Sequence, residues 1–153
     1  MIKKLAWLAA GITALVVLNT TQATAYPDRG SGSKCATGAS GTVCAHVETD
    51  ISSGHIRARA AADANSGKRI TITWVQLEEL TTERSTGQQS DTVPVYTHET
   101  ATSTGAVVSR IAGPVMEQCD NRLAYFQWRA YIAYTTSLGG PYIILTDWYS
   151  GAC

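Results

Sequence analysis

Hydrophobic and polar positions alternate with a period of two along most of the chain. Residues 55–63 read HIRARAAAD, so that apolar side chains fall on one face of an extended segment and polar ones on the other. The apolar set is Ile56, Ala58, Ala60 and Ala62, and the polar set is His55, Arg57, Arg59 and Asp63. This pattern is typical of an antiparallel strand with one buried face.

A second strand is predicted over residues 69–80, after turn residues at 65–68. Its apolar positions are even-numbered as far as Trp74, whereas Val75, Leu77 and the following Glu79 take the opposite parity. Since side chains of a regular strand alternate strictly between two faces, this change of parity predicts a β-bulge or a face change near Trp74.

More strands follow downstream. Residues 93–98 and 106–111 form two short ones around a turn at residues 102–105, and residues 123–136 fold back on residues 142–149 as a hairpin. Pro94 should lie on a sheet edge, because proline cannot donate to the hydrogen-bonded ladder.

Short strands separated by turn signals predict an all-β fold. The expected architecture is a two-sheet antiparallel sandwich, Ig-like or Greek-key-like, of about six to eight strands. The polar segment 81–92 has no period and is expected to be an exposed loop.

The N-terminal residues have the pattern of a secretory signal peptide. Lys3 and Lys4 precede an apolar run, and Ala23-Thr24-Ala25 supplies the small residues that signal peptidase requires. We therefore expect residues 1–25 to be cleaved and the mature protein to be secreted and extracellular, without a membrane segment. Residues 26–42 are predicted as a Gly/Ser-rich N-terminal arm, and residues 43–153 as a single β-sandwich domain.

All four cysteines lie in the predicted mature chain. An even number in an exported domain indicates two disulfides, for which three connectivities are possible. We favour Cys35–Cys44, which would pin a Gly/Ser-rich loop. Cys119–Cys153 then remains, at one end of the predicted C-terminal hairpin, and each bridge would stabilise the fold by about 2–4 kcal/mol.

Charge and motifs exclude several functions. Without Lys3 and Lys4, Asp and Glu slightly outnumber Lys and Arg, and the charges are scattered, so neither nucleic acid nor an anionic membrane is an expected partner. The chain has no nucleophile elbow, no His-Glu-x-x-His and no phosphate-binding glycine loop. We expect no cofactor and favour a non-enzymatic role.

One segment could nevertheless carry chemistry. In CAHVETD, residues 44–50, His46 and Glu48 fall on one face of an extended strand. An imidazole and a carboxylate at this spacing can bind one metal ion, or act as a base and its orienting group. A solvated strand face is the alternative interpretation of the same pattern.

The stretch LAYFQWRAYIAYTT, residues 123–136, is rich in aromatic side chains. Alternation assigns Phe126 and Trp128 to the core and directs Tyr125, Arg129 and Tyr131 outward. Tyr, Trp and Arg dominate the energetics of protein interfaces, and aromatic rings also stack on sugars. These outward residues, together with Arg84 in the 81–92 loop, are candidate binding residues; an ordinary outward sheet face is the alternative.

In size, export signal and two-disulfide β character, the chain resembles small secreted bacterial inhibitors of extracellular hydrolases. The α-amylase inhibitors of the tendamistat type carry a Trp-Arg-Tyr triplet at their contact site. Here the triplet is interrupted as Trp128-Arg129-Ala130-Tyr131 and lies within a predicted strand instead of a turn. We therefore do not transfer the function.

The sequence favours a secreted binding module, of which an inhibitor of an extracellular enzyme is one form. Its partner would be an extracellular protein or a glycan surface, and the expected state is a monomer. A metal-binding protein or hydrolase that uses His46 and Glu48 is the first alternative. A structural protein associated with the cell surface is the second.

Overall fold

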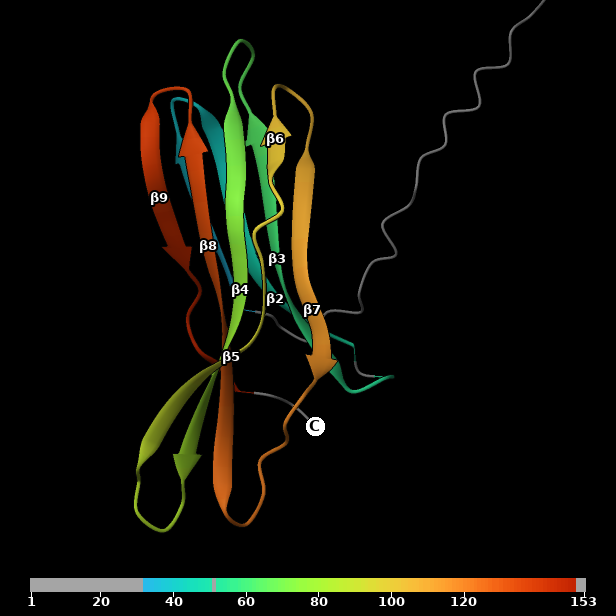
Figure 1. Ribbon diagram of the computed structural model, residues 1–153, viewed down its shortest axis with the longest axis vertical. Helices are drawn as coiled ribbons and strands as arrows, with labels where there is room; N and C mark the ends of the chain where they lie inside the picture. Colours follow the sequence, from blue (N-terminus) through green and yellow to red (C-terminus); the bar gives the residue numbers. More distant parts are fainter. Residues whose placement is uncertain (1–31, 51, 151–153) are drawn as a thin grey trace, which may run out of the picture.

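Residues 32–50 and 52–150 are described by the computed structural model, and their regular structure consists of β-strands (Figure 1). The strands are β1 (Ser33–Gly38), β2 (Gly41–Asp50), β3 (His55–Ala64), β4 (Ile70–Glu83), β5 (Gln89–Thr97), β6 (Ala101–Ser103), β7 (Val108–Met116), β8 (Ala124–Thr136), β9 (Gly139–Leu145) and β10 (Tyr149–Ser150). The predicted signal peptide lies outside the described residues.

The strands form two antiparallel sheets, as predicted. One has four strands in the order β1-β2-β3-β7, and the other has six, in the order β10-β8-β4-β5, with β6 on β4 and β9 on β8. The chain changes sheet between β3 and β4, between β6 and β7, and between β7 and β8. β4 therefore lies between β5 and β8 at the centre of the six-stranded sheet.

The core lies between the two sheets and follows the alternation of each strand. The four-stranded sheet contributes mainly small residues, and the six-stranded sheet contributes larger ones that fill the space, which is how a dry interior reaches high packing density. The buried residues are Val43, Ala45, Val47, Ile56, Ala58, Ala60 and Ala62 from the first, and Ile70, Ile72, Val75, Leu77, Trp128, Ala130 and Ile132 from the second. The predicted core face of residues 55–63 is confirmed, and so is that of the aromatic stretch at Trp128 and Ile132. Phe126, also predicted to lie in the core, is only partly buried and does not belong to the core cluster.

The irregularity near Trp74 is also confirmed. The register between β4 and β8 shifts between Ile72 and Trp74, so that Ile72 and Val75 are both buried while Trp74 points away from the core. Pro94 lies on β5, at an edge of the six-stranded sheet, and is exposed. The register of β5 with β4 shifts close to it, between Leu77 and Glu79.

Two segments differ from the prediction. Residues 33–38, within the expected arm, form β1 and pair with β2 along their whole length. Residues 81–92 are not a loop, because β4 continues to Glu83, β5 begins at Gln89, and only residues 84–88 form the turn. The outer part of this hairpin and the start of β8 project beyond the sandwich (Figure 1). Polar residues on both faces of the hairpin suit this exposed position.

The Cys35–Cys44 disulfide is confirmed and joins directly opposed residues of β1 and β2. Cys119 is not a free thiol, and its predicted partner Cys153 lies outside the described residues. Within the described ranges, no helix is long and apolar enough to cross a membrane.

Candidate interaction face

The six-stranded sheet turns one side toward the core and the other outward. We call the residues on its outward side the outer face; its members are Trp74, Gln76, Glu78, Tyr96, His98, Tyr125, Arg129, Tyr131 and Trp148. They come from β4, β5, β8 and the segments that follow β5 and precede β10. Their strand neighbours Val75, Leu77 and Ala130 are fully buried, which fixes the orientation of the face.

An aromatic stack lies on the β5 side of this face. The rings of Trp74 and Tyr96 are parallel within 6°, with centroids 4.9 Å apart, and His98 lies 6.3 Å from Trp74. The stack exists because the bulge after Ile72 turns Trp74 outward, toward the edge strand that carries Tyr96. Tyr96 remains 55% exposed, so a preformed aromatic surface faces solvent.

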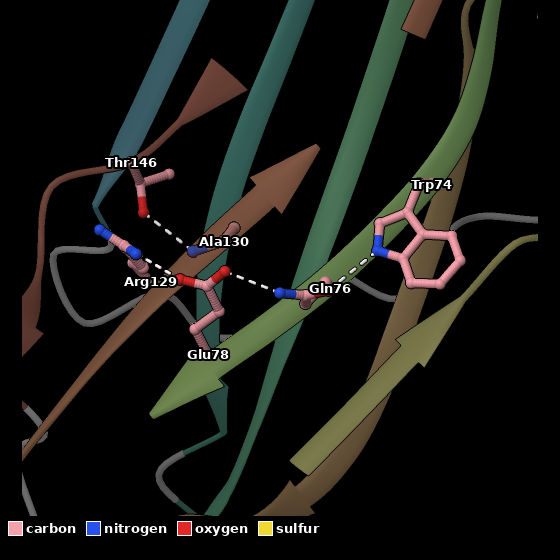
Figure 2. Close-up of polar contacts among 6 residues, drawn as sticks. All are labelled: Trp74, Gln76, Glu78, Arg129, Ala130 and Thr146. Carbon is pink, nitrogen blue, oxygen red and sulfur yellow. Dashed lines mark hydrogen bonds and ion pairs between the residues drawn. The ribbon is translucent and has the colours of Figure 1, made fainter. Parts of the chain in front are cut away.

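A row of hydrogen bonds continues from this stack across the sheet (Figure 2). Trp74 Nε1 donates to Gln76 Oε1 at 3.0 Å, and Gln76 Nε2 donates to Glu78 Oε1 at 2.7 Å. The other carboxylate oxygen of Glu78 accepts from Arg129 Nε. Each side chain in the row is therefore oriented by the next, and the row joins β4 to β8.

Arg129 also contacts an aromatic ring. Its guanidinium carbon lies 4.2 Å from the centroid of the Trp148 ring, a cation–π distance. Trp148, from the segment before β10, is thereby placed beside the predicted binding residues. Arg129 thus has an acidic partner on one strand and an aromatic partner from the C-terminal segment.

Thr146 holds the C-terminal segment against β8. It is buried, its Oγ1 accepts from the Ala130 N–H at 3.0 Å, and its own N–H donates to the Ala130 carbonyl at 3.1 Å (Figure 2). Both backbone groups of Ala130 are therefore satisfied where β9 ends. This joint sets the path of the chain toward Trp148.

The predicted residues Arg84 and Tyr125 are brought together. The Arg84 guanidinium carbon lies 3.7 Å above the Tyr125 ring, and the Arg84 N–H donates to the Leu123 carbonyl at 2.8 Å. Tyr131 lies opposite Gln76, so it borders the hydrogen-bonded row. Tyr125, Arg129 and Tyr131 share one face as predicted, but Arg129 stacks on Trp148, not between the two tyrosines.

Sequence reasoning did not identify Trp74, Tyr96 and His98 as one cluster. The parity change at Trp74 was the available signal, because it indicated a side chain that leaves the core. Placing Tyr96 beside it required knowledge that β5 pairs with β4 in this register. Sequence reasoning also did not identify Glu78 of β4 as the ion-pair partner of Arg129.

Glu48, which was predicted to share a metal ion or a catalytic role with His46, is bonded to two arginines. Glu48 is buried, and its two carboxylate oxygens accept from Arg57 Nε at 2.7 Å and Arg59 Nη1 at 2.9 Å. The register of β2 with β3 places Arg57 directly opposite Glu48 and Arg59 opposite His46. Two guanidinium groups repel a cation and occupy the oxygens that it would need.

In the described part of the chain, no group of three or more His, Cys, Asp or Glu side chains is positioned to hold a metal ion.

A cavity of about 250 Å³ opens at one end of the sandwich, between the β1–β2 and β8–β9 hairpins. Val43 and Ile70 line it, together with the rings of Tyr134 and Tyr142, whose centroids are 5.5 Å apart. Burial, with a smaller contribution from Tyr142, raises the pKa of Tyr134. No charged residue lines this cavity, so it offers no acid–base pair.

No protein-family model matches the chain, and no curated protein matches it in sequence. Function must therefore be argued from the arrangement of its own residues.

Proposed function

We propose that this protein is a secreted, non-enzymatic binding module that recognises an extracellular protein through the outer face. The observation that carries this proposal is the preformed aromatic and arginine surface. Trp74 is stacked on the half-exposed Tyr96, and a hydrogen-bonded row leads from Trp74 to Arg129.

The composition of the face suits protein recognition. Trp, Tyr and Arg are the side chains that contribute most to binding energy in protein interfaces. Here they stand on the strands of a sandwich and are oriented by one another before any partner binds. Binding therefore loses little side-chain entropy, which favours affinity.

A protein fits this face better than a glycan does. A sugar ring stacks against a free aromatic face, whereas three rings here already have a side chain of the protein over one face. Tyr96 covers Trp74, Arg129 covers Trp148, and Arg84 covers Tyr125. Beside these rings the surface carries the Gln76 amide, the Glu78 carboxylate and the Arg129 guanidinium group, a mixture that suits the polar and aromatic surface of another protein.

The predicted export supports an extracellular partner. The signal-peptide pattern of residues 1–25 directs the chain out of the cytoplasm, and the Cys35–Cys44 disulfide is compatible with an oxidising compartment. Inhibition of an extracellular enzyme is one form that such binding could take. No observation favours the metal-dependent or the purely structural alternative.

The test compares two matched double variants of residues 26–153. Tyr96→Ala/Tyr131→Ala truncates the outer face, and Ile111→Ala/Met116→Ala truncates exposed apolar residues of β7 in the other sheet. Each protein is immobilised and exposed to concentrated culture medium, and the retained proteins are identified and their affinities measured.

We expect the wild type and the β7 variant to retain a common protein, and the outer-face variant to bind it at least about tenfold more weakly. Equal retention by all three proteins would contradict the proposal. Binding of a purified glycan that depends on Tyr96 would replace the protein partner with a carbohydrate. Thermal unfolding of each variant controls for loss of the fold.

A further inference from the structure

The strand β9 forms an edge of the six-stranded sheet. Among the described strands it pairs with β8 alone, and it lies at the margin of the molecule (Figure 1). Tyr142 and Ile143 on this strand are 43% and 56% exposed. An edge strand presents N–H and C=O groups that can pair with another strand.

The register of β9 with β8 shows which backbone N–H and C=O groups of β9 point away from the sheet. Thr146 donates its N–H to the Ala130 carbonyl and accepts from the Ala130 N–H through its side-chain Oγ1, so the N–H of Thr146 points toward β8. In an antiparallel pair the direction alternates from residue to residue, and β9 is in regular register with β8 from Tyr142 to Leu145. Ile144 therefore points its N–H and C=O groups toward β8, whereas Ile143 and Leu145 point theirs away from the sheet.

The other long edges carry features that oppose pairing with another strand. β5 has Asp91, Pro94 and an irregular register, and β7 has Arg110 and Pro114. β1 has Lys34, and β6 and β10 are very short.

Pro141 lies within the first half of β9, but residues 142–145, which follow it, have no charge and no proline. Among the described edges, β9 is therefore the one open to pairing.

We propose that two copies of this protein pair through β9, antiparallel about a twofold axis at Ile144. In this register Ile143 of one copy lies opposite Leu145 of the second copy, and Ile144 lies opposite Ile144 of the second copy. Each outward-pointing residue then exchanges both backbone hydrogen bonds with its opposite number. The nearest charge, Asp147, falls opposite Pro141 and not opposite a second Asp147.

The edge is thus complementary to itself, since apolar residues meet apolar residues and no like charges meet. That property favours a second copy over an unrelated strand.

Pairing of two copies through β9 would place their two outer faces on the same side of the dimer. Ile143 and Leu145 lie on the same side of the sheet as Ala133 and Tyr131, their partners on β8, and Tyr131 belongs to the outer face. A twofold axis perpendicular to the sheet keeps both outer faces on one side of a continuous double sheet. The dimer is inferred independently of the proposed binding function, but it would make that function bivalent.

The test measures molar mass by analytical ultracentrifugation over a concentration series of residues 26–153. We expect the mass to rise toward twice that of the chain and to stop there. Ile143→Pro should remain monomeric at every concentration, because it removes an outward N–H group and no bond to β8. Ile143→Lys should do the same by placing a charge on the edge.

Two controls keep the test specific. Ile143→Val preserves the edge, and Met116→Lys introduces the same charge on exposed β7; both should dimerise like the wild type. A wild type that stays monomeric, a mass that grows beyond the dimer, or an Ile143→Lys variant that dimerises normally would each overturn the proposal.

Amide hydrogen exchange tests the register. Protection at Ile143 and Leu145 should rise with protein concentration, while Ile144 is protected at all concentrations. Concentration-dependent protection on another edge and not on β9 would also overturn the proposal.

Discussion

At the scale of single residues, carboxylates on the outward sides of both sheets are held by arginines from neighbouring strands. Glu48 accepts from Arg57 and Arg59, and Glu78 accepts from Arg129. Glu48 is the more buried of the two carboxylates, with a side chain that is 9% exposed. Removing the carboxylate deprives partly desolvated arginines of a charge partner, which is the main reason for the effect on stability.

Glu48→Ala should therefore lower the free energy of unfolding by about 2–4 kcal/mol. The lower part of this range is favoured because Arg59 is 35% exposed and its charge is screened by water. Glu48→Gln, which keeps the size and one acceptor, should lose less. Urea unfolding of both variants measures the difference, and an unchanged midpoint for Glu48→Ala would show that the ion pair does not contribute.

Glu79, unlike Glu48 and Glu78, is held in the fold by burial and not by an arginine named above. It lies opposite Trp128, and burial raises its pKa, although a hydrogen bond from Thr81 partly offsets this. Because the folded-state pKa lies above that of the unfolded chain, the protonated carboxyl favours folding. This contribution is lost as pH rises through the folded-state pKa.

Glu79→Gln should therefore raise the melting temperature at neutral pH. The gain should disappear in acid, below the ordinary pKa of about 4.3. Melting curves of wild type and variant across this pH range provide the measurement. A gain that is independent of pH would mean that ionisation of Glu79 is not the cause.

At the scale of elements, the joint between β9 and β10 determines how the C-terminal segment meets β8. The side chain of Thr146 replaces a backbone acceptor, so β8 remains fully bonded at Ala130 after β9 has ended. Trp148 follows two residues later and stacks on Arg129. The hydrogen bond from the Ala130 N–H to the Thr146 hydroxyl, which takes the place of a backbone bond between strands, therefore helps to position Trp148 on the outer face.

Thr146→Val keeps the shape but leaves the buried Ala130 N–H without an acceptor, and should reduce stability by about 1–3 kcal/mol. Thr146→Ser retains the hydroxyl and should be closer to wild type. Near-ultraviolet circular dichroism should also change in the valine variant, because Trp148 would be held less firmly on Arg129. Equal unfolding midpoints for the valine and serine variants would argue against the hydroxyl's role.

At the scale of the whole molecule, the fold is a sandwich whose six-stranded sheet extends beyond its four-stranded one. The Cys35–Cys44 bridge ties β1, an edge strand, to β2. The predicted Cys119–Cys153 bridge would tie the segment before β8 to the chain end. Together they would connect the N-terminal edge of one sheet and the C-terminal end of the other to the body of the fold.

If both bridges form, a thiol-alkylating reagent should label no cysteine in the denatured, unreduced protein and all four after reduction. Peptide mapping should then recover Cys119 linked to Cys153. Labelling of either residue before reduction would contradict the second bridge.

Much of the fold could be predicted from the sequence because the alternation of apolar and polar residues along a strand shows which of its faces is buried. The period of two in residues 55–63 reports the buried face directly, and the parity change at Trp74 reports the bulge. The short separation of Cys35 and Cys44 along the chain, together with the predicted export, led to the prediction of this disulfide. The register of β1 with β2 explains why it forms, because it places the two cysteines directly opposite each other. The 81–92 hairpin was missed because its strands project beyond the sandwich and have no apolar period.

The sequence alone determined which side of the strands with an apolar period faces inward, and hence that Tyr125, Arg129 and Tyr131 face outward. Only the tertiary structure decided which outward residues meet. β5, β4 and β8 are neighbours in the sheet although long segments separate β5 from β8 along the chain. Alternation depends on the residue next in sequence, whereas the pairing of Trp74 with Tyr96 and of Arg129 with Glu78 depends on strand order and register. Those are set by the packing of the whole core, and no single segment encodes them.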